Sequence, residues 1–448
     1  MEETVAPWEA IAPIIAQIVG EPNVFTWDTL DDRWRRQIQR AIAPGQPVAC
    51  LVFPGTPEEL AAVITLAHQH GYPVLPGGNG SKLSWGGVVG QANGNGLIVV
   101  STARLNRLIE HATGDLTVTM EAGMGFAELQ RILAKAGQFL AIDPAYPETA
   151  TIAGIVATAD TGSLRQQYNS VRDMLLGITF VRADGQIAKA GGRVVKNVAG
   201  YDLMKLFTGS YGTLGILTQL TFRVYPVSPA SQTVVLIGEA TAIAQLSQTI
   251  LPSALTPARF DLLSTGVVTH LGLGTGLGVA VQFHSIASSV QQQVSQVTAL
   301  GQTLQLSVAT FQEQDETALW QRLRERITQS TDEGAIACKI GIQPSQAVDL
   351  LQTHHLSLPG WYAQIHASSG LGRILIEDSS TLTSVLPQVR AICQEHRGFL
   401  SVLEAPLALK QQIDVWGYTG NGLEVMRQIK HQFDPDSRLS PHRFVGGI

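Results

Sequence analysis

The stretch 76–81 reads Pro-Gly-Gly-Asn-Gly-Ser, with three glycines in four successive positions. None of its side chains is a strong acid or base, so the chemistry it offers lies in the main chain. Successive N–H groups in conformations open to glycine converge into a concave anion site, and the missing side chains let a ligand approach closely. The pattern predicts a phosphate-binding site whose expected ligand is a pyrophosphate. The alternative interpretation is a surface turn. The residues concerned are Pro76, Gly77, Gly78, Asn79, Gly80 and Ser81.

A second stretch, 146–158, favours the phosphate site over the turn. It reads YPETATIAGIVAT and places small residues at the start of a predicted helix. The main-chain N–H groups at the start of a helix attract anions. Those residues are Thr149, Thr151, Ala153 and Gly154. Two further stretches add to the same interpretation: 191–226, which combines two glycine turns with an apolar strand, and the loop AIDPAY at 141–146.

Other phosphate-binding schemes do not fit. The chain contains no Gly-Lys pair, so there is no Walker loop. The segment 272–278, GLGTGLG, has Leu277 where a dinucleotide fingerprint needs its third glycine. It also precedes an apolar strand, whereas the fingerprint must precede a helix. We interpret it as a flexible hairpin turn.

Bulk composition narrows the class of protein. The chain has 448 residues, 45% of them apolar, which suits two or three domains, and its net charge of -6 argues against nucleic acid as a partner. The cysteines lie far apart, so neither disulfides, a zinc site nor an iron–sulfur cluster is indicated, and no metal site is predicted. The acidic N-terminus and the short apolar run 11–19 predict neither a signal peptide nor a transmembrane segment. We expect a cytoplasmic protein, with any membrane attachment made through partners.

Regular elements must position these loops. Residues 1–42 are predicted to form a helical extension, with three tryptophans that face a core: Trp8, Trp27 and Trp34. A capping box at 56–59 opens a helix that ends at Gly71. The short strand that follows leads into the glycine loop.

After residue 228 the order strand, helix, strand, strand, helix, strand occurs twice, over 232–310 and 335–404. A helix near 316–329 lies between the two copies. This is the split βαβ arrangement, and two copies can join into one antiparallel sheet with helices on a face. We therefore divide the chain into the extension (1–42), a binding domain (43–228), an α+β cap or substrate-like domain (229–422), and a helix and tail returning to the first half (423–448).

The order of motifs in 47–227 resembles the FAD-binding domain of the p-cresol methylhydroxylase/vanillyl-alcohol oxidase flavoprotein family. The matching segments are TPEEL (56–60), PGGNGS (76–81), EAG (121–123), TIAG (151–154), AGYDL (199–203) and GSYGTLG (209–215). The resemblance implies an α+β fold in which a two-subdomain FAD-binding domain precedes an antiparallel-sheet domain of duplicated split βαβ units. It also implies FAD as the cofactor, bound non-covalently because no histidine lies in 72–87.

Carried over to this sequence, the resemblance implies FAD contacts from three loops. The glycine loop 76–81 would wrap the pyrophosphate, and the backbone of Gly215 and Ile216 would lie near the adenine. Four residues would line the cofactor on the other side: Thr151, Ala153, Gly154 and Thr158. The sequence departs from the family where a Gly-Gly pair reads Ala153-Gly154, where Asn169 replaces a glycine, and where Asn-Pro-Gly near the C-terminus reads Ser-Pro-His at 440–442.

Within the family, 170–178, 191–203 and 433–444 most resemble the FAD-binding E subunits of glycolate oxidase (glycolate dehydrogenase). The resemblance implies a subunit of a complex that oxidises glycolate to glyoxylate and passes electrons to a non-nicotinamide acceptor. The implied partners are a catalytic flavoprotein subunit, an iron–sulfur subunit and a small 2-hydroxy acid substrate. The glutamate–histidine–glycine segment of the related catalytic subunits is missing from the comparable region, 402–417, which fits this division of labour.

Oxidation of a 2-hydroxy acid needs a base for the hydroxyl proton and a cation for the carboxylate. In QIHASSGLGRI (364–374), His366 ends a strand and Arg373 lies on the next strand, so we predict this pair as catalytic. The alternative is a structural or solvated histidine. His284 ends the corresponding strand of the first repeat, with Arg259 nearby in sequence.

Three other functions stay open at this point. One is a self-sufficient FAD-dependent dehydrogenase of D-lactate, another 2-hydroxy acid or a sugar acid. Another is a non-catalytic scaffold subunit of the same complex. The third is a nucleotide-sugar reductase of similar FAD architecture, which would consume NADPH.

Overall fold

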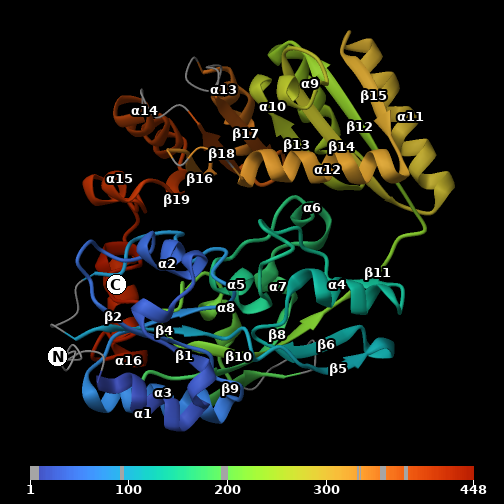
Figure 1. Cartoon of the computed structure of the whole chain (residues 1–448). Coiled ribbons are helices and arrows are strands. Elements are labelled where there is room, and N and C mark those ends of the chain that lie inside the picture. The colour runs from blue at the N-terminus through green and yellow to red at the C-terminus, as the bar shows by residue number, and fades with distance from the viewer. Residues whose placement is uncertain are drawn as a thin grey trace.

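The computed structural model describes residues 10–90, 95–192, 200–329, 332, 334–353, 360–377 and 382–448. Figure 1 shows two bodies, with an eight-stranded sheet and its helices above two smaller sheets that belong to the first half of the chain. The described residues do not include Trp8 or the segment 193–199, which contains Ala199 of the AGYDL motif. Among the described residues, no helix is long and apolar enough to cross a bilayer.

The first sheet has the order β1-β2-β4-β3, with β2, β4 and β3 parallel. Its strands are β1 (Val24–Phe25), β2 (Val48–Val52), β3 (Val74–Gly77) and β4 (Leu97–Ser101). The sequences VACLV and LIVVS are buried throughout, as continuous apolar runs in parallel strands predict. Helices α1 (Ala12–Val19) and α3 (Pro57–His70) cover one face of this sheet, and α2 (Asp32–Gln39) covers the other.

The N-terminal region contributes a strand as well as the expected helices. β1 pairs antiparallel with β2, so residues 24–25 of this region belong to the first sheet. Trp34 is buried and meets Phe53 edge to face at 5.8 Å, whereas Trp27 is half-buried. A strand of two residues leaves no periodic signal in a sequence, which is why only helices were expected here.

The caps of α3 and the short strand β3 place the glycine loop at the edge of this sheet. The N–H of Glu59 donates to the hydroxyl of Thr56, and Gly71 ends α3 in the left-handed conformation with φ of +73°. The chain then enters β3, which ends at Gly77 inside the loop itself. The hydroxyl of Ser101, at the end of the neighbouring strand β4, donates to the carbonyl of Gly78 at 2.8 Å. Two adjacent parallel strands therefore fix where the loop begins.

The second sheet is antiparallel, with the order β5-β6-β10-β8-β9. Its strands are β5 (Leu108–Ala112), β6 (Thr117–Glu121), β8 (Leu175–Val181), β9 (Ile187–Gly191) and β10 (Ile216–Arg223). The helices packed with it are α4 (Phe126–Ala134), α5 (Ile152–Ala157), α6 (Arg165–Tyr168), α7 (Val171–Met174) and α8 (Leu203–Phe207). A two-stranded ribbon of β7 (Gln138–Phe139) and β11 (Tyr225–Pro226) precedes the crossing into the upper body.

The eight-stranded sheet has the order β15-β12-β14-β13-β17-β18-β16-β19. Its strands are β12 (Ala230–Gly238), β13 (Pro257–Leu263), β14 (Leu277–Ser285), β15 (Ser307–Phe311), β16 (Ile336–Gly341), β17 (Trp361–His366), β18 (Leu371–Ile376) and β19 (Phe399–Glu404). The two predicted repeats are thus both present, and they join through the second strand of each, β13 and β17. The residues 272–276 link α10 (Thr265–His270) to β14, so the predicted turn follows a helix that the sequence pattern did not indicate.

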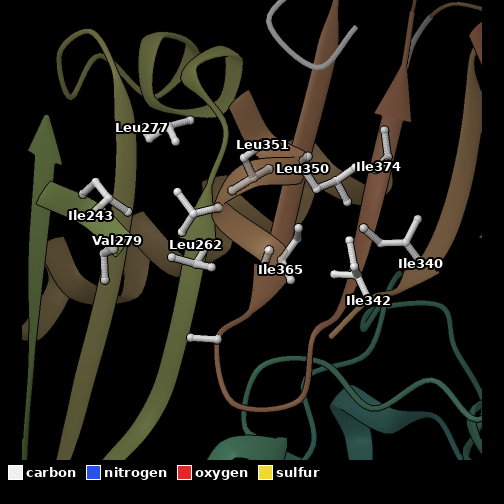
Figure 2. Close-up of a cluster of buried hydrophobic side chains, with 14 of the residues drawn as sticks. Ile243, Leu262, Leu277, Val279, Ile340, Ile342, Leu350, Leu351, Ile365 and Ile374 are labelled. Atoms are coloured by element: carbon white, nitrogen blue, oxygen red, sulfur yellow. The ribbon is translucent and has the colours of Figure 1, made fainter. Parts of the chain in front are cut away.

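The two faces of this sheet differ in character. Helices from both repeats pack on one face, namely α9 (Ala240–Ile250), α11 (Ala287–Thr303), α13 (Ala347–Gln352) and α14 (Leu382–Glu395). Figure 2 shows the apolar cluster there, where Ile243 and Leu262 of the first repeat share a core with Ile365 and Ile374 of the second. The other face is turned toward the lower body, and α12 (Glu313–Thr328) packs on it in an apolar cluster that α10 shares.

After α15 (Leu407–Gln412) the chain returns to the first body through α16 (Leu423–Phe433). The N–H of Val74 in β3 donates to the carbonyl of Arg438 at 2.8 Å. The buried ammonium of Lys430 donates to the carboxylate of Asp434 at 2.6 Å and to the carbonyl of Thr213 at 2.9 Å. The tail therefore braces both β3 and the loop 209–215.

We expect Lys430→Met to lower the free energy of unfolding by about 3–5 kcal/mol, because it leaves the Asp434 carboxylate buried without its cation. Urea denaturation followed by circular dichroism measures this change. Arg427→Met, at an exposed position on the same helix, serves as the control and should stay within about 0.5 kcal/mol of the wild type. A Lys430→Met variant as stable as that control would contradict the bracing role.

Candidate functional site

The twelve residues predicted to bind the cofactor line one groove between the two smaller sheets. The glycine loop forms one wall, and residues of α5 with the start of β10 form the other. Sequence reasoning missed several residues that complete the groove, among them Lys82, Tyr211 and Arg443. Lys82 directly follows the glycine loop and Tyr211 lies inside the GSYGTLG motif, so both had a local signal; Arg443 comes from the distant tail and had none.

The glycine loop has unused hydrogen-bond donors. Among the residues that the structure describes, the five main-chain N–H groups of 78–82 have no acceptor. A Cβ atom at Gly78 would lie 2.1 Å from the hydroxyl of Thr151, and Gly80 has a φ of +82°. A side chain at Gly78 would therefore push the two walls apart, and one at Gly80 would strain the backbone. The free N–H donors of the loop suit a diphosphate.

The start of α5 does not offer the anion site that the sequence predicted. The N–H groups of Ile152 and Ala153 already donate to the carbonyls of Met124 and Ala122, at 2.9 and 3.0 Å. The third, at Gly154, donates to the hydroxyl of Thr151 at 3.3 Å. These donors are satisfied within the subdomain, so this helix contributes a close wall of small residues and the anion donors come from the glycine loop.

A second cavity lies between this groove and the eight-stranded sheet, and Thr158 lines both. His366 and Arg373, the predicted catalytic pair, both line the second cavity, together with Arg259. His284 is not among its lining residues, and burial lowers the pKa of that histidine to about 4. The structure thus brings the predicted pair together beside the groove and leaves the first repeat's histidine away from it.

His366 is held by a buried carboxylate. Its Nδ1 lies 2.6 Å from Oδ1 of Asp261, which is fully buried in β13. The amide of Gln364 donates to the other oxygen of Asp261 at 2.8 Å. With Nδ1 engaged, Nε2 is the ring nitrogen left for a ligand. Asp261 had no local signal, because it faces His366 only through the pairing of β13 with β17.

Arg373 belongs to a buried ion network centred on Asp160. Lys82 Nζ lies 2.7 Å from Oδ2 of Asp160, and the N–H of Ala145 donates to the same oxygen at 2.9 Å. Arg373 donates to Oδ1 of Asp160. Burial alone would raise the pKa of Asp160, but Arg373 and Lys82 outweigh burial and hold that pKa below its ordinary value. Asp160 is therefore ionised and matched by two cations from different parts of the chain.

Lys339 of β16 adds a cation whose charge depends on pH. It lies in the same cavity and reaches the carbonyl of Ala159 at 3.5 Å. Burial, reinforced by the positive charge of Arg373, lowers the pKa of Lys339 to about 8. Lys339 therefore loses its positive charge progressively as the pH rises through about 8.

Basic side chains outnumber carboxylates in this cavity. The basic residues that line it are Arg165, Arg259, Arg324, Lys339 and Arg373, and the carboxylates are Asp143 and Asp160. An excess of buried positive charge calls for an anion. Among the described residues, no group of three or more His, Cys, Asp or Glu side chains gathers in a way that could hold a metal ion. The cavity is suited to a carboxylate placed beside a histidine base.

Comparison with a solved structure defines the class of fold. The chain superposes on p-cresol methylhydroxylase with substrate bound at a TM-score of 0.75 and 14% identity, covering 98% of this chain and 97% of that one. The fold is therefore of the p-cresol methylhydroxylase type, and the predicted α+β architecture is confirmed.

Residues 48–191 match the FAD binding domain family, so the chain carries an FAD binding domain and FAD is its cofactor. It is 30% identical over 214 residues to the glycolate oxidase subunit GlcD of Bacillus subtilis, covering 48% of this chain and 45% of the relative. It is 30% identical over 298 residues to a probable mitochondrial D-lactate dehydrogenase of Danio rerio (64% and 58%). It is 24% identical over 423 residues to a D-2-hydroxyglutarate dehydrogenase of Xanthomonas citri (87% and 88%). The matches to the first two relatives span about half of their length.

We expect Gly78→Ala to raise the dissociation constant for FAD by at least about tenfold, because the new methyl group meets Thr151 and spreads the groove. Titration of the apoprotein with FAD, followed by flavin fluorescence, measures the change. Gly114→Ala is the control, since a Cβ there meets nothing within 4 Å. Unchanged FAD affinity in a folded Gly78→Ala variant would count against the groove as the cofactor site.

We also expect the affinity for a carboxylate probe such as oxalate to fall with rising pH, by up to about tenfold per pH unit above 8. The reason is that Lys339 loses its positive charge as the pH passes its pKa of about 8. Calorimetric titrations between pH 6.5 and 9.5 test this. Lys339→Arg, which stays charged, should remove the dependence, and an identical pH profile in that variant would contradict the assignment.

Proposed function

We propose that this protein is an FAD-dependent oxidoreductase of the glycolate oxidase/dehydrogenase type, acting on a small 2-hydroxy acid bound in the cavity that His366 and Arg373 line. One observation carries the proposal: a cavity with excess positive charge and a carboxylate-held histidine adjoins the groove of the FAD binding domain, with Thr158 lining both. The names of the three relatives, which act on 2-hydroxy acids, support the same substrate class.

The groove residues would hold the cofactor as the family resemblance implies. The N–H groups of 78–82 would bind the pyrophosphate, and Gly215 with Ile216 would lie near the adenine. Thr151, Ala153, Gly154 and Thr158 would form the opposite wall. Bound FAD supplies the two-electron acceptor for the hydride that leaves the substrate carbon.

His366 and Arg373 suit the two ends of a 2-hydroxy acid. They lie on the paired strands β17 and β18, which are ~4.8 Å apart, so one side chain can meet the hydroxyl while the other meets the carboxylate. His366 would take the hydroxyl proton, and the buried Asp261 carboxylate would stabilise the imidazolium that forms. Arg373 and Lys339 would neutralise the substrate carboxylate.

A second candidate is a subunit that holds FAD beside a catalytic flavoprotein and an iron–sulfur subunit. The segment 402–417 supports it. Glu404 there accepts hydrogen bonds from the hydroxyls of Ser84 and Tyr146, at 3.2 and 3.3 Å, and Lys410 donates to the carbonyl of Gly86 at 2.9 Å. The segment that carries a histidine in related catalytic subunits thus serves here to join the cap to the glycine loop region.

We expect His366→Gln to lower kcat roughly 100- to 1000-fold, with a much smaller change in KM, because the variant loses the base and keeps the carboxylate-binding cations. The assay is reduction of an artificial dye by the purified, FAD-loaded chain with glycolate or D-lactate. Ser368→Ala, two residues further along in an exposed turn, is the control and should match the wild type. Equal kcat values for His366→Gln and that control would exclude His366 as the base.

The same assay separates the two candidates. Dye reduction by the chain alone supports the self-contained oxidoreductase. Retention of FAD without dye reduction, followed by activity when catalytic and iron–sulfur subunits are co-purified, supports the subunit. Protein that stays colourless after incubation with FAD would contradict both candidates, and consumption of NADPH with a nucleotide sugar would replace them with a reductase.

A further inference from the structure

Strand register places a row of polar side chains across the face of the eight-stranded sheet that borders the second cavity. Directly paired residues are Asp261 with His366, Gln364 with Arg373, and Arg373 with Lys339. Paired residues share a face of the sheet, and so do alternate residues along a strand. Arg259, two residues before Asp261, therefore lies on this face too.

This row puts positive charge on both sides of His366. In the strand order β13-β17-β18-β16, Arg259 stands on one side of the histidine, and Arg373 and Lys339 stand on the other. The proposed reaction uses only the second group, because a 2-hydroxy monoacid has one carboxylate. The first group has no role in it.

The first group includes a second arginine that has no direct anionic contact among the described residues. Arg259 is already occupied, since its Nε lies 3.3 Å from Asp143 and its Nη1 donates to Gln282 at 3.0 Å. Its guanidinium also lies 4.6 Å from the ring centre of Trp320 on α12. One turn further along α12, the half-buried Arg324 lines the same cavity, and among the described residues its guanidinium has neither a hydrogen bond nor an ion pair.

We infer that the substrate is a 2-hydroxy dicarboxylate, with the carboxylate beside the hydroxyl held by Arg373 and Lys339 and the distal carboxylate held by Arg324 next to Arg259. This inference rests on the proposed function and narrows it. Asp143 attracts Arg324 without forming an ion pair with it, so a monoacid would leave this half-buried guanidinium with no direct anionic contact. A diacid of roughly four or five carbons spans the one strand spacing of ~4.8 Å from β17 to β13, which carries Arg259, and Arg324 lines the same cavity from α12.

The chemistry balances in the same way as for a monoacid. His366 would accept the hydroxyl proton, bound FAD would supply the acceptor for the hydride and its two electrons, and the product would be a 2-oxo diacid. The distal carboxylate takes no part in the bond changes, so it contributes only binding and orientation.

The test compares diacids with monoacids on the FAD-loaded chain. We expect kcat/KM for dye reduction to be at least roughly tenfold higher with D-malate or D-2-hydroxyglutarate than with glycolate or D-lactate. Arg324→Met should lower the ratio of diacid to monoacid kcat/KM by roughly 100-fold. Arg322→Met, at an exposed position of the same helix that does not line the cavity, is the control and should leave the ratio unchanged.

A binding measurement without turnover completes the test. Calorimetry should show 2-oxoglutarate binding more tightly than pyruvate, with the difference lost in Arg324→Met. Tighter binding of the diacid by a chain that reduces no dye still supports the inference. Equal binding and oxidation of monoacids and diacids, with no effect of Arg324→Met, would overturn the inference while the proposed function stands. A chain that neither oxidises any 2-hydroxy acid nor binds any 2-oxo acid would overturn the proposed function and the inference with it.

Discussion

The buried carboxylate of Asp160 is the constraint on which the arrangement of this protein depends. A carboxylate removed from water is stable only if cations and N–H donors surround it, and here they come from three separate places. Lys82 follows the glycine loop, Arg373 lies on β18 of the upper body, and the N–H of Ala145 belongs to the loop 141–146. The requirement to neutralise one charge therefore sets how the upper body meets the FAD binding domain.

Other polar contacts lie around this ion network and join the same parts. The hydroxyl of Tyr146 donates to the carbonyl of Thr328 in α12 at 2.8 Å, and Arg443 of the tail donates to the carbonyl of Leu83 at 2.7 Å. Because hydrogen bonds are directional, such contacts specify one relative placement of the parts more sharply than apolar packing does. The cavity beside the groove is a consequence of that placement, and so is its excess of positive charge.

The eight-stranded sheet has one apolar and one polar face because successive side chains of a strand point to opposite faces. Residues facing α9, α11, α13 and α14 are apolar and form a continuous core across both repeats. The alternating residues on the other face are free to be polar, because the opposing body satisfies them. Figure 1 shows α12 lying between part of the sheet and the lower body. The two repeats thus form one frame, and the second face of the sheet carries the polar side chains that border the second cavity.

Local order in this chain is determined by the sequence alone, since strand alternation, helix caps and glycine turns act over a few residues. This is why the two repeats, the capping of α3 and the glycine loop could all be predicted. The small residues at the start of α5 predicted an anion site, but the N–H groups there donate to Met124 and Ala122. The strand β1 could not be predicted because two residues are too few to show a period. Only the tertiary structure decided which charges meet. Asp261 reaches His366 through strand register, and Arg324 and Lys339 enter one cavity from different elements, because such contacts depend on pairing and docking between residues far apart in the chain.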